Sequence, residues 1–334
     1  MELVVDNVNE AFSEIFWKFR CQNIEPEITR NGPALVYPEM VTTTYRFPDE
    51  RVLFDPGRDA NPIFHLMESI WMLAGRRDVA FVEQYNKNMK NFSDDGVNFN
   101  AAYGWRWRQH FGHDQIIDVI ELLRKEPRTR QAVVQMWDTH DLYKRTVDKA
   151  CNTQIVFQVR NDELHMTVFN RSNDLWWGAY GANAVHFSFL HEFVARASNR
   201  MLGRYSQVSV NFHLYTELYD TCNYLESPPD KKHDAYLSGE VKPYRLMENN
   251  DYVGFLQDCQ IFCSNPLNDK YDYTHAFFKE VAKPMAAIYR ERKSKVSDGL
   301  HLVPDIQATD WRLATLKWLE RRITNKGELN EKDT

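Results

Sequence analysis

The residues best suited to chemistry lie between Cys151 and Asn183, where a cysteine precedes two strand-like segments. The second segment ends in NRSND, residues 170–174, and WWGAYGAN follows shortly after. A thiolate is the strongest side-chain nucleophile near neutral pH, and a nearby cation favours that charged form. Arg171, one predicted strand away, would supply the cation. A lone cysteine at a strand start is more often a small buried hydrophobe, so the surrounding pattern decides between the two interpretations.

Other common chemistries find no support in the chain. There is no GxxxxGK phosphate loop, no HExxH and no dinucleotide-binding glycine pattern. The cysteines are odd in number and scattered, and Cys259 and Cys263 form an isolated pair without a second pair to complete a zinc site. The sequence therefore predicts no metal and no disulfide framework, which fits a reducing cytoplasm.

The overall charge argues against general nucleic-acid binding. A net charge of −6 and a pI near 6.0 are opposite to the basic surface that replaces counterions on phosphates. Any bound anion must be held by a few local cations. The N-terminal MELVVDNVNEAF has acids where a signal peptide needs basic residues, and no apolar run reaches about 18 residues. We expect a cytoplasmic protein with no membrane association.

The elements that must position these residues alternate without a regular order. Helical spacing of apolar residues predicts helices near 8–19, 63–74, 116–123, 184–198 and 215–225, with two more near 273–292 and 308–323. Strand-like text occupies parts of 26–60, then 131–137, 154–161, 164–170 and 205–215, with Asn161-Asp162 at a hairpin turn. Residues 226–270 are rich in Pro, Asp, Lys and Asn and predict a loop or insertion. The mixed order favours an α+β fold in a single domain, 1–334, with a central mixed sheet and a divergent helical part at 271–334.

The run from Cys151 to Asn183 resembles the thymidylate synthase family, including its nucleotide 5-hydroxymethylase branch. In that family a nucleophilic cysteine is followed at this distance by an Arg-Ser-x-Asp tetrad, here Arg171 to Asp174, and then by a glycine and an Asn or Asp. HLMESIWMLAG around Glu68, AYGWRWR from Tyr103, and HLY from His213 are similar to other family phrases. The resemblance covers about residues 10–220 and implies the family's fold.

The resemblance also implies a reaction. Addition of the Cys151 thiolate to C6 of a pyrimidine nucleotide makes C5 able to attack the one-carbon unit of 5,10-methylenetetrahydrofolate. Glu68 would be the general acid and base, with Tyr103 and His213 ordering its water. Forked arginine donors suit a 5′-phosphate, and the implied phosphate ligands are Arg30, Arg171 and Ser172, with Arg128 and Arg130 crossing the interface of a homodimer.

The same resemblance assigns the folate and the base. Asp174 would bind the pterin, beside Gly178, and Tyr215 the sugar hydroxyl. Trp176 and Trp177 suit stacking on the pterin, although core or dimer packing is an equal alternative. Asn183 would recognise the pyrimidine edge, because an amide offers the donor and acceptor that match uracil. Strict counting from Cys151 places Ala182 at that position, so Asn183 requires one extra residue in WWGAYGAN.

Departures from the family favour a hydroxymethyl product. Asn152 follows the nucleophile where thymidylate synthases usually have His, and MKNFSDDGVNFNAA lacks the tryptophans that shield the methylene intermediate. The chain ends in ELNEKDT and not in a short apolar tail. An exposed methylene group is open to water, whereas methylation needs a dry pocket.

The sequence therefore predicts conversion of deoxyuridine monophosphate (dUMP) to 5-hydroxymethyl-dUMP. Three alternatives stay open: a dCMP hydroxymethylase, a thymidylate synthase, and a catalytically silent protein that sequesters nucleotides or binds a partner through 226–270. A ribonucleotide substrate is also open.

Overall fold

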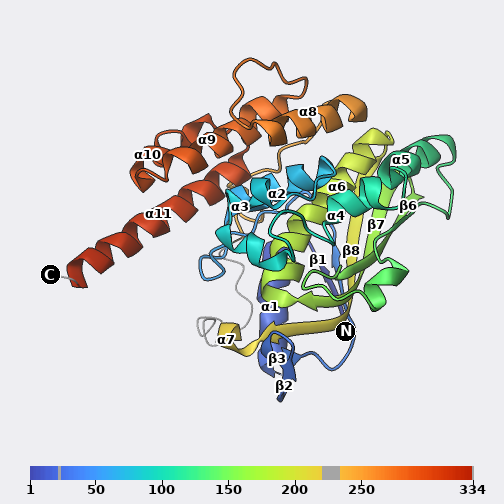
Figure 1. The fold of residues 1–334 in the computed structure, drawn as a ribbon, viewed down its shortest axis with the longest axis horizontal. Helices are drawn as coiled ribbons and strands as arrows, with labels where there is room; N and C mark the ends of the chain where they lie inside the picture. The colour runs from blue at the N-terminus through green and yellow to red at the C-terminus, as the bar shows by residue number, and fades with distance from the viewer. Residues whose placement is uncertain (22–23, 220–233, 333–334) are drawn as a thin grey trace.

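A mixed β-sheet forms the centre of the computed structural model, which describes residues 1–21, 24–219 and 234–332 (Figure 1). The sheet order is β1-β4-β8-β7-β6-β5, with β3 also on β8 and β2 on β3. The β1/β4 and β7/β8 pairs are parallel and the others antiparallel. The strands are β1 (Glu2–Val5), β2 (Pro26–Thr29), β3 (Gly32–Val36), β4 (Val41–Tyr45), β5 (Val133–Gln135), β6 (Asn152–Arg160), β7 (Glu163–Asp174) and β8 (Met201–Tyr215).

The β6–β7 hairpin carries the candidate nucleophile at one end and the predicted turn at the other. Asn161 and Asp162 both have positive φ, 52° and 65°. A two-residue hairpin turn that matches the right-handed twist of its strands requires this conformation at both positions. Side chains along β7 alternate between buried and partly exposed, so one face of the hairpin packs on the core. The predicted hairpin is confirmed.

Helices follow the predicted periodicity closely. The α-helices are α1 (Val8–Cys21), α2 (Pro62–Leu73), α3 (Val79–Glu83), α4 (Tyr103–Trp105), α5 (Gln115–Lys125), α6 (Asn183–Ala197), α7 (Thr216–Tyr219), α8 (Tyr252–Ser264), α9 (Lys283–Glu291), α10 (Val296–Leu300) and α11 (Thr309–Lys332). The 3₁₀- and π-helical turns are η1 (Lys87–Phe92), η2 (Arg106–His110), η3 (Thr139–Leu142), η4 (Leu175–Ala182), η7 (Phe278–Ala282) and η8 (Val303–Asp305). Of the helix predicted at 215–225, residues 220–225 lie outside the described ranges.

Helix α2 is the most enclosed helix of the fold. Asn61 caps it by accepting a hydrogen bond from the Phe64 amide at 3.1 Å, and Pro62 occupies its first position. Every residue of α2 is buried. It packs against α6 on one side and against α8, α9 and α11 on the other, and Figure 1 shows it between these groups. The C-terminal helices therefore share one hydrophobic core with the sheet.

The prediction of a loop or insertion at 226–270 is wrong for Tyr252–Ser264, which form α8. Asp251 caps this helix by accepting from the Gly254 amide at 3.0 Å. Phe255, Cys259 and Phe262 recur at helical spacing and are buried. The polar composition of the flanking residues masked this short apolar stripe. Residues 226–233 lie outside the described ranges.

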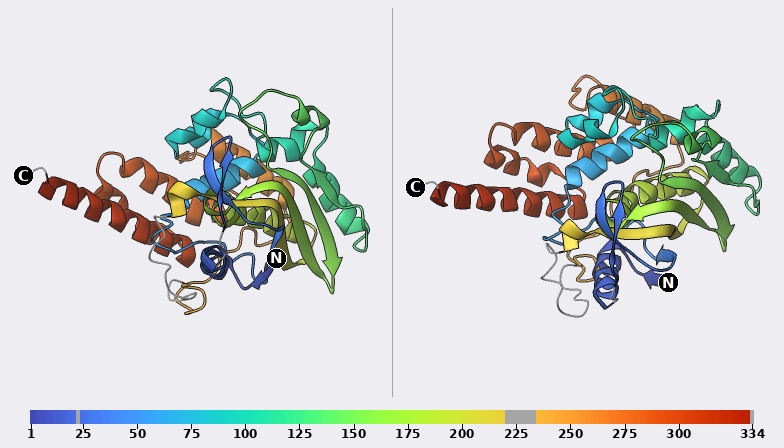
Figure 2. Two further views of the ribbon diagram at one scale, coloured as in Figure 1. Left: turned by 90° about the horizontal axis from the view of Figure 1, so that it is seen from below. Right: turned by 60° about the horizontal axis from the view of Figure 1, so that its bottom comes forward.

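Helices α9, α10 and α11 account for the predicted helical C-terminal part, and α11 projects from the body of the molecule in both views of Figure 2. In the described ranges, no helix combines the length and apolarity needed to cross a bilayer. Four cysteines, Cys21, Cys151, Cys259 and Cys263, are free thiols. Cys222 lies outside the described residues.

Candidate active site

A cavity of about 340 Å³ brings six of the predicted site residues together. Its walls come from the β2–β3 turn, α2, α4, the segment before β6, β7 and the start of α6. These elements are far apart in sequence and meet at one end of the sheet. The six predicted residues in its lining are Arg30, Glu68, Tyr103, Cys151, Arg171 and Asn183.

Cys151 stands immediately before β6, with its half-buried thiol facing this cavity. The Arg171 amide donates to the Cys151 carbonyl at 2.9 Å, which fastens the cysteine to β7. Burial raises the pKa of the thiol, the Arg171 guanidinium lowers it, and the nearby Asp148 carboxylate raises it. The thiol therefore lies between two opposite charges.

Arg171 is held by main-chain groups around the nucleophile. Its Nε donates to the Ala150 carbonyl at 2.9 Å, and a terminal nitrogen lies 3.3 Å from the Lys149 carbonyl. The guanidinium also lies over the Trp137 ring, 5.4 Å from its centroid. Arg171 and Arg30 are both exposed at the cavity, so each can offer donors to an anion that enters it.

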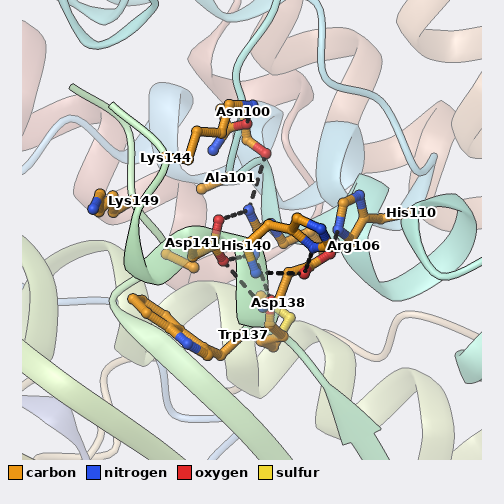
Figure 3. A network of polar contacts seen from close by, with 12 residues as sticks. Asn100, Ala101, Arg106, His110, Trp137, Asp138, His140, Asp141, Lys144 and Lys149 are labelled. Carbon is orange, nitrogen blue, oxygen red and sulfur yellow. Dashed lines mark hydrogen bonds and ion pairs between the residues drawn. The ribbon is translucent and has the colours of Figure 1, made fainter. Parts of the chain in front are cut away.

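A buried polar network fixes the segment that leads to Cys151 (Figure 3). Arg106 forms an ion pair with Asp141 and donates to the Met136 carbonyl at 2.7 Å. Farther along, Asp148 accepts from the Ala101 amide at 2.8 Å. These contacts tie residues 136–148 to the chain just before and after Tyr103.

Tyr103 is placed by close packing of α4 on α2. A Cβ at Gly104 would lie 1.9 Å from the Met72 carbonyl oxygen, so only glycine allows this approach. The Tyr103 ring stacks on Phe187, with centroids 5.7 Å apart. Burial and the Cys151 charge raise the pKa of Tyr103, which keeps its hydroxyl protonated as a donor.

Glu68 projects from α2 into the cavity and meets a histidine that sequence reasoning missed. Nε2 of His186, on α6, lies 3.1 Å from Oε2 of Glu68, and both side chains are buried. His186 follows Asn183 by three positions, so the two share one face of α6 and both line the cavity. That spacing was the available signal, but a histidine in an apolar helix gives no indication of what it faces.

The turn after β7 separates the two predicted tryptophans. Trp176 is buried against Phe12, with centroids 5.6 Å apart, and does not line the cavity. Trp177 is 53% exposed and lies under the Arg58 guanidinium at 4.6 Å. Asp174 caps η4 by accepting from the Trp177 amide, and burial raises its pKa to about 6. Its Oδ2 is buried without a hydrogen-bond partner among the described residues.

The extra residue of WWGAYGAN is accommodated by a π-helical turn. The backbone N–H of Asn183 donates to the carbonyl of Gly178, five residues earlier. In an α-helix the acceptor would be the carbonyl four residues earlier. Nδ2 of Asn183 donates to Oδ1 of Asn173 at 3.0 Å. A Cβ at Gly178 would lie 2.8 Å from that same oxygen, so glycine leaves room for the contact.

The remaining predicted residues lie around the cavity and do not line it. The His213 and Tyr215 rings meet at the end of β8, 5.3 Å apart, and burial lowers the pKa of His213. The Tyr215 hydroxyl accepts from Nδ2 of Asn31, a cavity residue, at 3.2 Å. Ser172 is half-buried beside Arg171.

Arg128 and Arg130 are exposed just before β5, the strand at one edge of the sheet, and lie outside the lining of this chain's cavity. Their role across a dimer interface stays a prediction. No cluster of three or more His, Cys, Asp or Glu side chains suited to a metal occurs within 1–21, 24–219 and 234–332.

Comparison with known proteins gives a consistent assignment. The chain is 44% identical to a deoxyuridylate hydroxymethyltransferase of Pseudomonas phage M6, over 95% of this chain and 93% of that protein. It is 41% identical to the deoxyuridylate hydroxymethyltransferase of Bacillus phage SP01, over 54% of this chain and 50% of that protein. The crystal structure of thymidylate synthase from T4 phage superposes with a TM-score of 0.56 at 22% identity, covering 66% of this chain and 81% of that one, and supports the fold. The family profile described as Thymidylate synthase matches residues 61–242, and the chain belongs to the thymidylate synthase family.

Proposed function

We propose that the protein converts dUMP to 5-hydroxymethyl-dUMP, with 5,10-methylenetetrahydrofolate as the carbon donor and Cys151 as the covalent nucleophile. The observation that carries the proposal is the shared cavity, in which the thiol, two arginines and Glu68 converge. The names of the two phage relatives support the same substrate and product.

The roles of the protein groups follow from their positions. The Cys151 thiolate adds to C6 of the pyrimidine, and Arg171 stabilises the thiolate from 4.0 Å. Arg30 and Arg171 bind the 5′-phosphate, which explains how an acidic protein holds a dianion. Glu68 takes and returns protons as general base and acid, and the Tyr103 hydroxyl orders the water beside it.

A chain of side-chain amides supports uracil as the base. Nε2 of Gln207 donates to the Ala179 carbonyl at 3.0 Å, and a carbonyl can only accept. The Gln207 oxygen must therefore accept from Nδ2 of Asn173, at 3.3 Å. Oδ1 of Asn173 then accepts from Asn183, which orients the Asn183 amide.

The fixed Asn183 amide keeps its oxygen and one N–H for the ligand. This pair complements N3–H and O4 of uracil. Recognition of cytosine would require the amide to rotate by about 180° and place two oxygens against each other at Asn173. We therefore assign dUMP, and not dCMP, as the substrate.

The cavity wall supports hydroxymethylation over methylation. From the stretch 89–102, Met89, Phe92 and Phe99 line the cavity, and Phe92 is 57% exposed. Val147, also in the lining, is 52% exposed, and the one tryptophan among the described residues of the lining, Trp71, is buried on α2. A wall with exposed apolar side chains admits water to a reactive methylene group, whereas hydride transfer needs water to be excluded.

Folate binding is supported by groups beside the cavity. The carboxyl oxygen of Asp174 that has no partner among the described residues is suited to the N–H groups of a pterin, and exposed Trp177 offers a ring for stacking. When bound, 5,10-methylenetetrahydrofolate supplies a carbon that needs no further reduction to become hydroxymethyl.

We further propose that the active form is a homodimer in which Arg128 and Arg130 reach the partner's phosphate site. Support comes from their exposed position before the edge strand β5. Val133 on β5 and Val210 on β8 are 41% and 63% exposed, and the strand register puts both on the same open face of the sheet. A second sheet packed on this face would cover them.

The deciding experiment is a product analysis by mass. The protein is incubated with 5,10-methylenetetrahydrofolate and either dUMP or dCMP, and we expect 5-hydroxymethyl-dUMP from dUMP. Formation of dTMP with dihydrofolate absorbance would identify a thymidylate synthase, and reaction only with dCMP a dCMP hydroxymethylase. Cys151→Ala should abolish exchange of the C5 hydrogen. Nucleotide binding without any exchange would identify a silent binding protein.

A further inference from the structure

His186 lines the cavity, and no other histidine among the described residues does so. Asn152 follows the nucleophile at the position where the family usually has a histidine. Its Nδ2 donates to the Phe169 carbonyl at 2.8 Å, and it does not line the cavity. The cavity thus receives its imidazole from α6, next to Glu68.

The contact between His186 and Glu68 is close but incomplete. Their Nε2 and Oε2 atoms are 3.1 Å apart, yet they are not aligned as a hydrogen bond, and Nε2 has no hydrogen-bond partner among the described residues. The two side chains are 3% and 8% exposed. A buried polar nitrogen without a partner is costly, so it is expected to bind a water or a ligand group in the cavity.

We propose that His186 is a positioning residue for the water that becomes the hydroxyl of the product. Its imidazole holds the Glu68 carboxylate and this water at the methylene carbon on C5 of the nucleotide. The inference rests on the proposed function, because only a hydroxymethylase adds water at this carbon.

The step balances without an oxidant or a reductant. The water oxygen forms a bond to the methylene carbon, and one water proton passes to Glu68. The electron pair of the methylene double bond moves into the ring as an enolate at C4. The enolate then re-forms the C4 carbonyl and the C5–C6 double bond, the C6–S bond breaks, and Cys151 leaves as the free thiolate.

A neighbouring histidine provides a matched control. His65 lies on α2 one turn before Glu68, and its ring centroid is 6.2 Å from that of His186. It is buried and does not line the cavity. Burial lowers the pKa of His65 well below its ordinary value, so this ring stays neutral.

The test compares two events in one reaction: release of the C5 hydrogen of dUMP, which precedes water addition, and formation of 5-hydroxymethyl-dUMP. His186→Asn should lower the ratio of product to released hydrogen roughly tenfold. Added 2-mercaptoethanol should then capture more of the methylene group as a thioether. His186→Gln, whose amide nitrogen can reach the position of Nε2, should restore most of the ratio, and His65→Asn should leave it unchanged. Because the ratio is taken within one sample, partial unfolding does not alter it.

A readout without folate tests the contact itself. The ¹⁵N resonance of His186 Nε2 in the free protein should shift in Glu68→Gln. An unchanged ratio in His186→Asn, failure of His186→Gln to restore a lowered ratio, or an unmoved resonance would overturn the inference alone. Absence of 5-hydroxymethyl-dUMP from the wild-type reaction would overturn the proposed function and the inference together.

Discussion

A terminal nitrogen of Arg171 lies 4.0 Å from Sγ of Cys151, and the same guanidinium donates to the carbonyl of Ala150, the residue just before the cysteine. The cation is thus fixed by the very segment whose thiol it stabilises. Asp148, two residues farther back, acts on the thiol with the opposite sign. The local sequence around the nucleophile therefore tunes its ionisation from both directions.

Neutralising Asp148 and neutralising Arg171 should change the reactivity of the Cys151 thiol in opposite directions. Asp148→Asn removes a negative charge that raises the Cys151 pKa, and its amide oxygen can still accept from the Ala101 amide. A lower pKa gives more thiolate at pH 7, so alkylation by iodoacetamide should accelerate several-fold. Arg171→Gln should raise the pKa and slow alkylation. Equal rates in both variants across pH 6 to 9 would contradict this electrostatic account.

Uracil selectivity should depend on Asn173, which does not line the cavity. Asn173→Ala removes the acceptor that orients the Asn183 amide, so the ratio of kcat/KM for dUMP over dCMP should fall roughly tenfold, equivalent to about 1.4 kcal/mol. Ser209→Ala is the control. It removes one of the two acceptors of Asn173, at 2.9 Å, and leaves Gln207 in place, so the ratio should change much less. A similar loss in both variants would show that packing, and not amide orientation, sets the preference.

Shared active sites should reveal themselves by complementation. Cys151→Ala lacks the nucleophile, and the double variant Arg128→Ala with Arg130→Ala lacks the proposed interface cations. In a mixed dimer one site combines an intact thiol with intact arginines, so mixing the two inactive proteins should restore about one quarter of wild-type turnover. Each variant mixed with itself serves as the control. Activity no greater than the sum of the separate proteins would exclude a phosphate site that spans two chains.

The junction between the core and α11 should make stability depend on pH through Asp310. This buried carboxyl accepts from the Tyr236 hydroxyl at 3.0 Å, and burial raises its pKa to about 7. At pH values between the pKa of Asp310 in the unfolded chain, near 4, and its pKa in the folded protein, about 7, the folded state binds one more proton than the unfolded state. The free energy of unfolding therefore falls as the pH rises through this range.

From pH 5 to 8 the loss attributable to Asp310 should be about 3 kcal/mol by urea unfolding. Asp310→Asn should flatten the dependence. Exposed Asp305, replaced in the same way, should leave it as in the wild type. Parallel pH profiles for wild type and Asp310→Asn would contradict the assignment.

Much of the fold could be read from periodicity because most helices and strands bury one clean face. The β6–β7 hairpin was predictable from Asn161-Asp162, and α2 from its apolar run. Helix α8 was not, because its buried stripe is short and lies within polar sequence. The sequence also provides no indication of His186, because its contact, Glu68, lies on a helix far away in the sequence.

The family resemblance predicted six residues that line the cavity, but it did not fix which residue of WWGAYGAN faces the base. Counting residues left Ala182 and Asn183 as rivals for the base, and both line the cavity. The hydrogen bond from the Asn183 amide to Gly178, five residues earlier, shows how one extra residue fits. A π-helical turn has no sequence composition of its own, so the sequence does not indicate it.

The enclosure of α2 limits how far this chain can be shortened. The region that matches the family profile ends at residue 242, yet α8, α9 and α11, which lie beyond it, cover one side of the helix that bears Glu68. A fragment cut at that boundary would open an apolar wall to water and should self-associate before it could bind a nucleotide. The minimal unit for expression therefore extends at least through the start of α11, well past the border suggested by sequence similarity.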